Sequence, residues 1–258
     1  MLTYLPQALK AYLITTAELT QFAGRFFREV FRPPYEFSEL VRQSYRIGYQ
    51  SMPLVGITGF IMGVVLTLQS RPTLIEFGAE SWMPSMVGLS IVREIGPVIT
   101  ALICAGKVGS SIGAELGSMK VTEQIDAMEV SGTNPFKYLV VTRVVAATLM
   151  LPVLVVLADV ISLCGSFLVE NVKGGVGWTL YFNQVFASLA FGDIIPSVGK
   201  SFFFGFAIGL VGCYQGYCSE KGTEGVGAAA NTAVVMASML VFILDFLAVL
   251  AADIFYEL

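Results

Sequence analysis

Three carboxylates lie inside otherwise apolar stretches of this 258-residue chain: Glu94, Asp159 and Asp245. If these stretches cross a membrane, a charge at the bilayer centre costs about 2.5 to 3.5 kcal/mol on insertion scales. Each carboxylate then needs a partner, a wet cavity or a proton path. Arg93 precedes Glu94, which predicts a position near the membrane surface or in a wet cavity. For Asp245, the deepest by sequence, we favour ion pairing within a helix bundle, and proton coupling is the alternative.

Side chains for hydrolytic or metal chemistry are scarce. The chain has no histidine, which removes the usual zinc ligand and the usual general base. Gly199-Lys200-Ser201 is a near match to a phosphate-binding loop, but the glycine required five residues earlier is Ile194. We therefore expect no metal, no cofactor and no catalysis in this chain, and any nucleotide hydrolysis would need a second polypeptide. The four cysteines lack a CxxC pair and are expected to be buried thiols: Cys104, Cys164, Cys213 and Cys218.

The composition indicates a membrane protein. Of the residues, 55% are hydrophobic and 13% are charged, and the mean hydropathy is +0.75. About twenty apolar residues cross a bilayer as a helix whose backbone groups pair within the segment. We therefore predict an all-α polytopic membrane protein with five permanent spans, and without a basic stripe nucleic acid is not an expected partner. The spans cover residues 52–69, 86–112, 138–168, 198–218 and 232–255.

Residues 1–50 are predicted to form amphipathic helices that precede the membrane domain at 51–258. Apolar residues fall near one helical face over 2–32, and Pro33-Pro34 ends that helix. Such a helix lies in the membrane interface rather than crossing it. A second short amphipathic helix is expected over 38–49. For both, packing against another subunit is the alternative.

The third and fourth spans are joined by an apolar run, Thr179 to Phe191, that is too short to span. We predict that it is interfacial or re-entrant. The orientation follows from the positive-inside bias. A cytoplasmic N-terminus places most of the 15 lysines and arginines on the cytoplasmic side. Five spans then place the C-terminal Glu257-Leu258 on the opposite side.

Residues 117–135 have the pattern of a short polar helix between two apolar segments. Thr122 is the predicted N-cap, Gly132 can take the left-handed conformation at the C-terminus, and Pro135 prevents continuation. The helix is expected to be about ten residues long. It could dock a soluble partner, or it could be an ordinary cytoplasmic loop helix. Its apolar face is predicted to carry Val121, Ile125 and Met128.

Glycines spaced four residues apart lead toward this short helix: Gly109, Gly113 and Gly117. Small residues at this spacing let helix backbones approach closely. We favour packing within the chain over a face for self-association. Motion of the short helix would then be transmitted along this close helix–helix contact.

The run from Arg93 to Pro135 reads REIGPVITALICAGKVGSSIGAELGSMKVTEQIDAMEVSGTNP, and it resembles the signature region of MlaE-family permeases. Chain length, five spans and the amphipathic N-terminal helix fit the same family. The resemblance implies an ABC transporter permease of the bacterial inner membrane, working as a homodimer. It also implies a substrate, glycerophospholipid moved between the inner membrane and periplasmic carriers to maintain outer-membrane lipid asymmetry. The implied partners are an MlaF-like ATPase that binds ATP and Mg, an MlaB-like STAS-domain protein and an MlaD-like ring of MCE-domain subunits.

The resemblance also implies functional residues. The short polar helix would be the coupling helix that meets the ATPase, with Val121, Ile125 and Met128 as packing anchors and the polar side chains supplying specificity. The residues implied for ATPase coupling are Met119, Lys120, Val121, Thr122, Glu123, Gln124, Ile125, Asp126 and Met128. The residues implied for lipid binding are Leu66, Leu74 and Phe77, with Glu94 near the rim of the cavity.

Three other functions remain open at this point. A permease of the related Mce systems would carry another lipid or a sterol. A proton-coupled secondary carrier would use Asp159 and Asp245. A membrane anchor that transports nothing is the third, and the interruption of the second span by Pro97 argues mildly against it.

Overall fold

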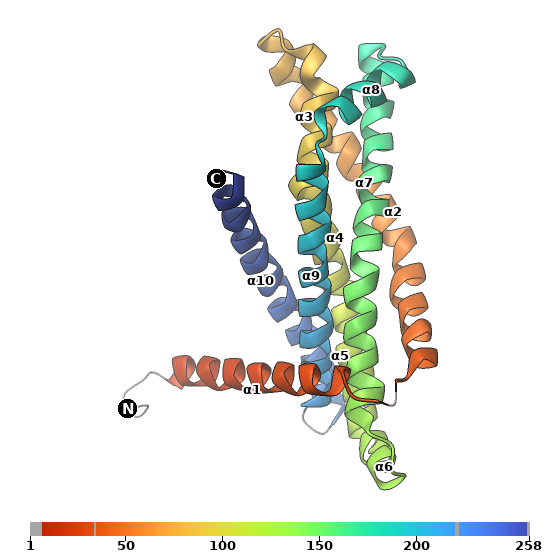
Figure 1. Cartoon of the computed structure of the whole chain (residues 1–258), viewed down its shortest axis with the longest axis vertical. Helices are drawn as coiled ribbons and strands as arrows, with labels where there is room; N and C mark the ends of the chain where they lie inside the picture. The colour runs from red at the N-terminus through yellow and green to blue at the C-terminus, as the bar shows by residue number, and fades with distance from the viewer. Residues whose placement is uncertain (1–6, 34, 220–221, 257–258) are drawn as a thin grey trace.

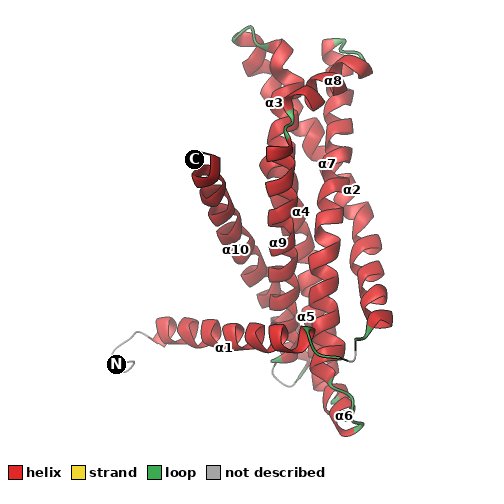
Figure 2. Ribbon diagram, in the orientation of Figure 1, coloured by secondary structure: helices red, strands yellow, loops and turns green. Residues whose placement is uncertain are grey.

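The computed structural model describes residues 7–33, 35–219 and 222–256, and these residues form helices and short connections without a strand (Figure 2). Within them, five helical segments are long and apolar enough to cross a membrane. The predicted all-α fold with five spans is confirmed. Pro34, Lys221 and the predicted C-terminal Glu257-Leu258 lie outside the described residues. The five segments are Phe37–Glu76, Glu80–Val121, Phe136–Gly174, Phe191–Tyr217 and Thr223–Ala252.

The first span is α2 (Phe37–Glu76), one continuous helix of 40 residues. The prediction of a separate short helix over 38–49 is therefore wrong. The reason is a buried stripe with a period of four that runs unbroken through both parts and faces α7 (Thr142–Gly174). In the first part of α2 this stripe consists largely of small and polar residues, so the sequence there has no hydropathy signal that would predict a buried helix face. Its members include Gln43, Ile47, Ser51, Val55, Gly59, Gly63, Thr67 and Arg71.

The second span is a stack of short helices rather than one regular helix. After the turn η2 (Glu80–Trp82), α-helical and π-helical segments alternate without leaving the helical path. Pro97 lies in the first turn of α4, directly after a π-helical segment. Proline offers no N–H to the carbonyl group four residues before it. The helix continues through the expected interruption at Pro97 because the preceding turn is a wider, π-helical one. The segments are α3 (Met83–Ser90), η3 (Ile91–Ile95), α4 (Gly96–Cys104), η4 (Ala105–Gly109) and α5 (Ser110–Val121).

The remaining spans complete the bundle around α7. The third span is η5 (Phe136–Val141) followed by α7; α9 (Phe191–Tyr217) packs against both α7 and α5, and α10 (Thr223–Tyr256) packs against α9 and α5. The connection α8 (Trp178–Ser188) is 11 residues long, about 17 Å at 1.5 Å per residue. It lies at the opposite end of the bundle from α6 (Gln124–Val130) and does not cross it (Figure 1). We refer to these two ends as the α6 end and the α8 end.

Close glycine contacts hold the helices together. A Cβ atom on Gly212 would lie 3.0 Å from the carbonyl oxygen of Gly109, and one on Gly216 would lie 2.7 Å from that of Gly113. Gly117 faces the backbone of Val226 on α10, 3.5 Å from its Cα atom. The glycine ladder of α5 therefore packs within the chain, against α9 and α10.

The N-terminal helix α1 (Gln7–Val30) runs across the bundle at the α6 end, roughly perpendicular to the spans (Figure 1). Phe22 packs its ring 5.0 Å from that of Phe136 and 5.6 Å from that of Tyr214. Arg25 lies 4.1 Å over the ring of Phe136. A helix in this position, with exposed apolar residues such as Leu13 and Ile14, fits the predicted interfacial placement.

Candidate functional site

A cavity of about 370 Å³ opens where η3 faces α9 and the C-terminal half of α10. It combines charged side chains from the second and fourth spans with apolar walls from α9 and α10. This mixture of few polar groups and apolar surface is typical of a ligand site. The lining residues are Arg93, Glu94, Gly192, Asp193, Pro196, Ser197, Lys200, Ala248, Val249 and Ala252.

Lys200 is the centre of this charged pocket. Its side chain is 6% exposed, and its Nζ atom lies 2.6 Å from Oε2 of Glu94 and 2.9 Å from Oδ1 of Asp245. A buried ammonium is tolerated only when paired and hydrogen-bonded, and here two carboxylates supply that pairing. The favoured interpretation of Asp245 as a structural ion-pair partner is confirmed. Lys200 also ties α9 to both the second and the fifth span.

A second ion pair closes the side of the pocket toward the α8 end. Arg93 donates from Nε to Oδ1 of Asp193 at 2.6 Å, and Oδ2 of Asp193 accepts from the backbone N–H of Ala190 at 2.9 Å. Asp193 lies in the first turn of α9 and satisfies a free N–H there. One carboxylate thus caps α9 and holds Arg93 of the second span.

Asp159 on α7 is buried beside the pocket, and its Oδ1 atom has no hydrogen-bond partner among the described residues. It packs on Gly96, where a Cβ atom would lie 1.8 Å from Oδ1. The sequence allowed an ion pair for Asp159, and the described residues do not provide one. The absence of a side chain at Gly96 is what lets this carboxylate approach the second span.

The residues implied for lipid binding do not form one site. Leu66 and Leu74 pack against an apolar cluster near α8 that includes Met83 and Tyr181. Phe77 follows the end of α2 and is 79% exposed. Glu94 alone of the four lines the charged pocket.

Sequence reasoning missed Asp193, Ser197 and Lys200 as pocket residues. Their spacing of i, i+4 and i+7 on α9 was the available signal, since it places three polar side chains on one face of an apolar helix. The described residues contain no cluster of histidine, cysteine, aspartate and glutamate that could hold a metal.

The short helix α6 forms the far tip of the other end of the bundle. Thr122 ends α5 instead of starting α6, so its prediction as the N-cap is wrong. The N-cap is Glu123, at φ 58°, and this left-handed residue lets the chain leave the axis of α5. The helix has 7 residues rather than about ten. Gly132 has φ 82°, as predicted for the residue that ends the helix.

The burial of the side chains on α6 differs from the prediction at Ile125 and Val130. Ile125 is 1% exposed and belongs to the core of the bundle, and Met128 and Met119 pack against the same core. Ile125 therefore anchors α6 to its own chain and is not available to a partner. Val130 is 90% exposed and was missed. Of the implied coupling residues, those exposed are Thr122, Glu123, Gln124 and Asp126, while Lys120 and Val121 are half-buried and Lys120 lies 3.0 Å from Asp126.

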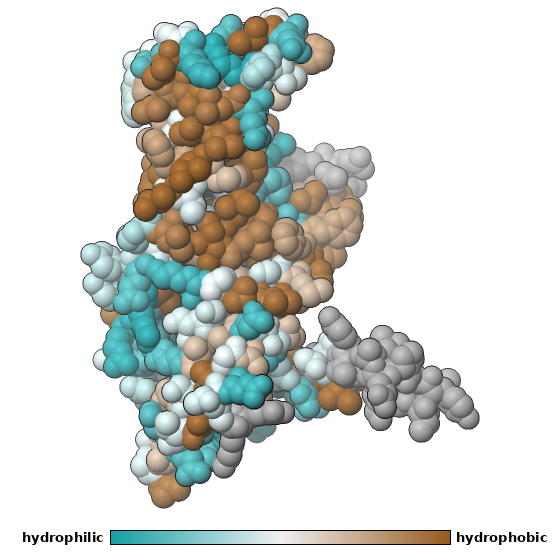
Figure 3. Space-filling model, turned by 180° about the vertical axis from the view of Figure 1, so that it is seen from behind, coloured by the Kyte–Doolittle hydropathy of each residue, from teal (hydrophilic) through white to brown (hydrophobic). Residues whose placement is uncertain are grey.

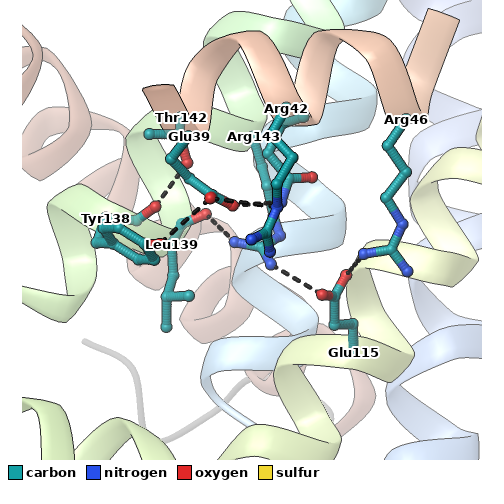
Figure 4. A network of polar contacts seen from close by, with 9 residues as sticks. Glu39, Arg42, Arg46, Glu115, Tyr138, Leu139, Thr142 and Arg143 are labelled. Atoms are coloured by element: carbon teal, nitrogen blue, oxygen red, sulfur yellow. Dashed lines mark hydrogen bonds and ion pairs between the residues drawn. The ribbon is translucent and has the colours of Figure 1, made fainter. Parts of the chain in front are cut away.

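Glu115 connects α5 to the neighbouring spans two turns before α6. Its Oε2 accepts from Arg46 on α2 at 2.8 Å, and its Oε1 accepts from Arg143 on α7 at 3.1 Å (Figure 4). Arg143 is 2% exposed and also donates to the backbone carbonyl of Leu139 at 2.9 Å. Glu115 therefore joins α5 to both α2 and α7.

A family model described as permease MlaE matches residues 40–251. A probable ABC transporter permease protein of Rickettsia typhi is 44% identical over 218 residues, 84% of each chain. A probable ABC transporter permease protein of Synechocystis is 34% identical over 86% of this chain and 85% of its own. The intermembrane phospholipid transport system permease protein MlaE of Haemophilus influenzae is 36% identical over 82% of this chain and 81% of its own.

Proposed function

Because this chain belongs to the MlaE permease family, we propose that it is the membrane subunit of an ATP-driven transporter that moves glycerophospholipid between a membrane and its carriers. The multi-pass fold and the ABC permease relatives support this. The phospholipid substrate rests on the name of the Haemophilus relative and on the chemistry of the charged pocket.

One observation carries the proposal: a single helical stack connects the exposed tip to the pocket. The second span runs from Glu80 to Val121, carries Arg93 and Glu94 at the pocket, and leads directly into α6. Glu94 and Val121 are about 40 Å apart along a helical path. Force on α6 would reach the pocket along this one element.

ATP hydrolysis is assigned to a separate chain. The near match at Gly199-Lys200-Ser201 lies inside α9, where Lys200 is occupied by two carboxylates. The exposed acidic and apolar surface of α6, with Glu123, Asp126 and Val130, is the proposed contact for an MlaF-like ATPase. We extend the proposal to an MlaB-like STAS protein on that ATPase and an MlaD-like MCE ring at the α8 end. The α6 end is then cytoplasmic, in agreement with the positive-inside bias.

The pocket suits a phospholipid headgroup. Arg93 is half exposed and can meet a phosphate, while Glu94 is 48% exposed and can meet an ammonium or hydroxyl group. Phe203 on α9 and Phe246 on α10 are 64% and 63% exposed, and offer apolar surface for acyl chains or for a second copy of the chain. The proposed assembly is a homodimer.

In the transport step, the pocket would change from a conformation that accepts lipid to one that releases it. Closure of the ATPase dimer would push α6, move Glu94 relative to Lys200, and favour the lipid-releasing arrangement. α10 is the least buried span and Lys200 holds it through Asp245. It can therefore move when that pairing changes, which would squeeze lipid from the pocket.

The test is charge reversal on α6. In the double variant Glu123→Lys/Asp126→Lys, the tagged chain should no longer co-purify the ATPase, and ATP-dependent lipid flux in proteoliposomes should fall to background. Glu224→Lys is the matched control, because Glu224 is an exposed acid in the first turn of α10, near the α6 end of the bundle but outside α6. An intact complex with normal flux in the double variant would refute the coupling role of α6.

A further inference from the structure

A second cavity, of about 80 Å³, lies between α2 and the junction of η4 and α5. It is separate from the charged pocket and from the exposed face of α6. Seen from behind, hydrophilic side chains gather below the apolar band of the bundle, on the side where the first half of α2 lies (Figure 3). The lining residues are Gln43, Arg46, Ile47, Gln50, Ser51, Lys107, Val108, Ser111, Ile112 and Glu115.

The cavity and its walls carry more positive than negative charge. Arg46 and Arg143 share the single carboxylate of Glu115, and Lys107 donates to the backbone carbonyl of Gln50. Two cations, Arg46 and Lys107, therefore line the cavity with one anion, Glu115. Arg143 also has a buried Nε atom without a hydrogen-bond partner among the described residues. An excess of positive charge in a partly buried cavity favours the binding of an anion.

Ser51 gives an independent indication of a missing ligand. Its side chain is 1% exposed, it lines the cavity, and its hydroxyl has no hydrogen-bond partner among the residues that the structure describes. On the same helix Thr58 and Thr67 donate to the carbonyl groups four residues before them, at 2.7 and 2.8 Å. Buried hydroxyl groups are rarely left unpaired. The Ser51 hydroxyl is free to donate to a group inside the cavity.

The backbone conformation around Lys107 is a further indication of a functional site. Lys107 lies in the π-helical segment η4, and single π-helical turns within α-helices occur frequently at functional sites. An ammonium group has three N–H donors, and the contact with Gln50 uses one of them. Lys107 can hold that contact and a ligand oxygen together.

We propose that this cavity binds the phosphate of an anionic phospholipid headgroup from the membrane leaflet at the α6 end. Arg46, Lys107 and Ser51 supply the donors. A lipid is favoured over free phosphate because the cavity opens on the flank of a membrane span, beside exposed apolar and aromatic side chains. Tyr45 and Tyr49, stacked at 5.0 Å, are exposed on the same part of α2, as expected at headgroup level. Basic pockets between transmembrane helices are known to hold anionic headgroups.

The inference goes beyond the proposed transport function and does not depend on it. Its test uses the full chain in nanodiscs of phosphatidylcholine that contain a minor fraction of phosphatidylglycerol. Native mass spectrometry counts the phosphatidylglycerol retained on the released protein. Lys107→Gln should lower its occupancy about tenfold, since it removes a hydrogen bond to a charged group. Ser51→Ala should lower it less and leave the melting temperature unchanged, because the hydroxyl it removes bonds to no other group in the described part of the chain.

Two controls locate the binding. Arg28→Gln removes an exposed positive charge from α1 at the same end of the bundle and should leave occupancy unchanged. Lys173→Gln removes an exposed positive charge at the α8 end and should also leave it unchanged. Equal occupancy in Lys107→Gln and Arg28→Gln would overturn the proposal, and so would a loss confined to Lys173→Gln. Nanodiscs of phosphatidylcholine alone with millimolar inorganic phosphate form the last arm, and a phosphate adduct there that Lys107→Gln removes would overturn the lipid assignment.

Discussion

The Lys200 ammonium lies 2.6 Å from the Glu94 carboxylate, and this contact joins α9 to the helical stack that ends in α6. The same ammonium holds Asp245 on α10. The least buried span, α10, is therefore linked to the second span through this ion-paired side chain as well as through its packing on α5. A permease that works by moving α10 needs such a connection.

The ion pairs of Lys200 should contribute measurably to the free energy of unfolding. Lys200→Met leaves Asp245 partly buried and unpaired, and we expect it to lower the free energy of unfolding by about 3 kcal/mol. Adding Asp245→Asn should recover much of that loss, because Glu94 is half exposed and can be hydrated. Thermal unfolding of both variants and of Asp245→Asn in detergent gives the double-mutant cycle. Strictly additive effects would show that the two charges do not interact.

Gly63 on α2 is expected to be intolerant of any side chain. A Cβ atom there would lie 1.8 Å from the backbone oxygen of Ser162 on α7, so Gly63→Ala should force the two helices apart and destabilise the protein by about 1 to 3 kcal/mol. Gly106→Ala is the matched control, because Gly106 has no neighbour within 4 Å of its Cβ position. It should be neutral or slightly stabilising. Equal melting temperatures for the two variants would contradict the close α2–α7 contact.

Val130 is expected to contribute to binding of the partner ATPase but not to the stability of the fold. It is 90% exposed on α6, so Val130→Asp should leave the melting temperature unchanged and reduce recovery of the ATPase on the tagged chain. Val172→Asp, at an exposed valine of the α8 end, is the control and should retain the ATPase. Full retention of the ATPase by Val130→Asp would remove Val130 from the contact.

The sequence predicts the spans well because twenty apolar residues leave a strong local signal, and it predicts partners across the bundle poorly. Lys200 and Glu94 are 106 residues apart, and no local pattern joins them. Periodicity correctly gave α6 an apolar face, but it could not tell that Ile125 faces its own bundle. It also missed the continuity of α2 at its start, since the buried stripe there consists of polar and small residues such as Gln43 and Ser51.

The central claim is that movement of α6 changes the charged pocket. Spin labels at Ile195 on α9 and Phe246 on α10, both exposed beside the pocket, report the separation of these helices in the assembled transporter after replacement of the native cysteines. We predict different distance distributions in the nucleotide-free and ATP-bound complexes, and the loss of that difference in Glu123→Lys/Asp126→Lys. Identical distributions in both nucleotide states of a complex that still moves lipid would contradict the account.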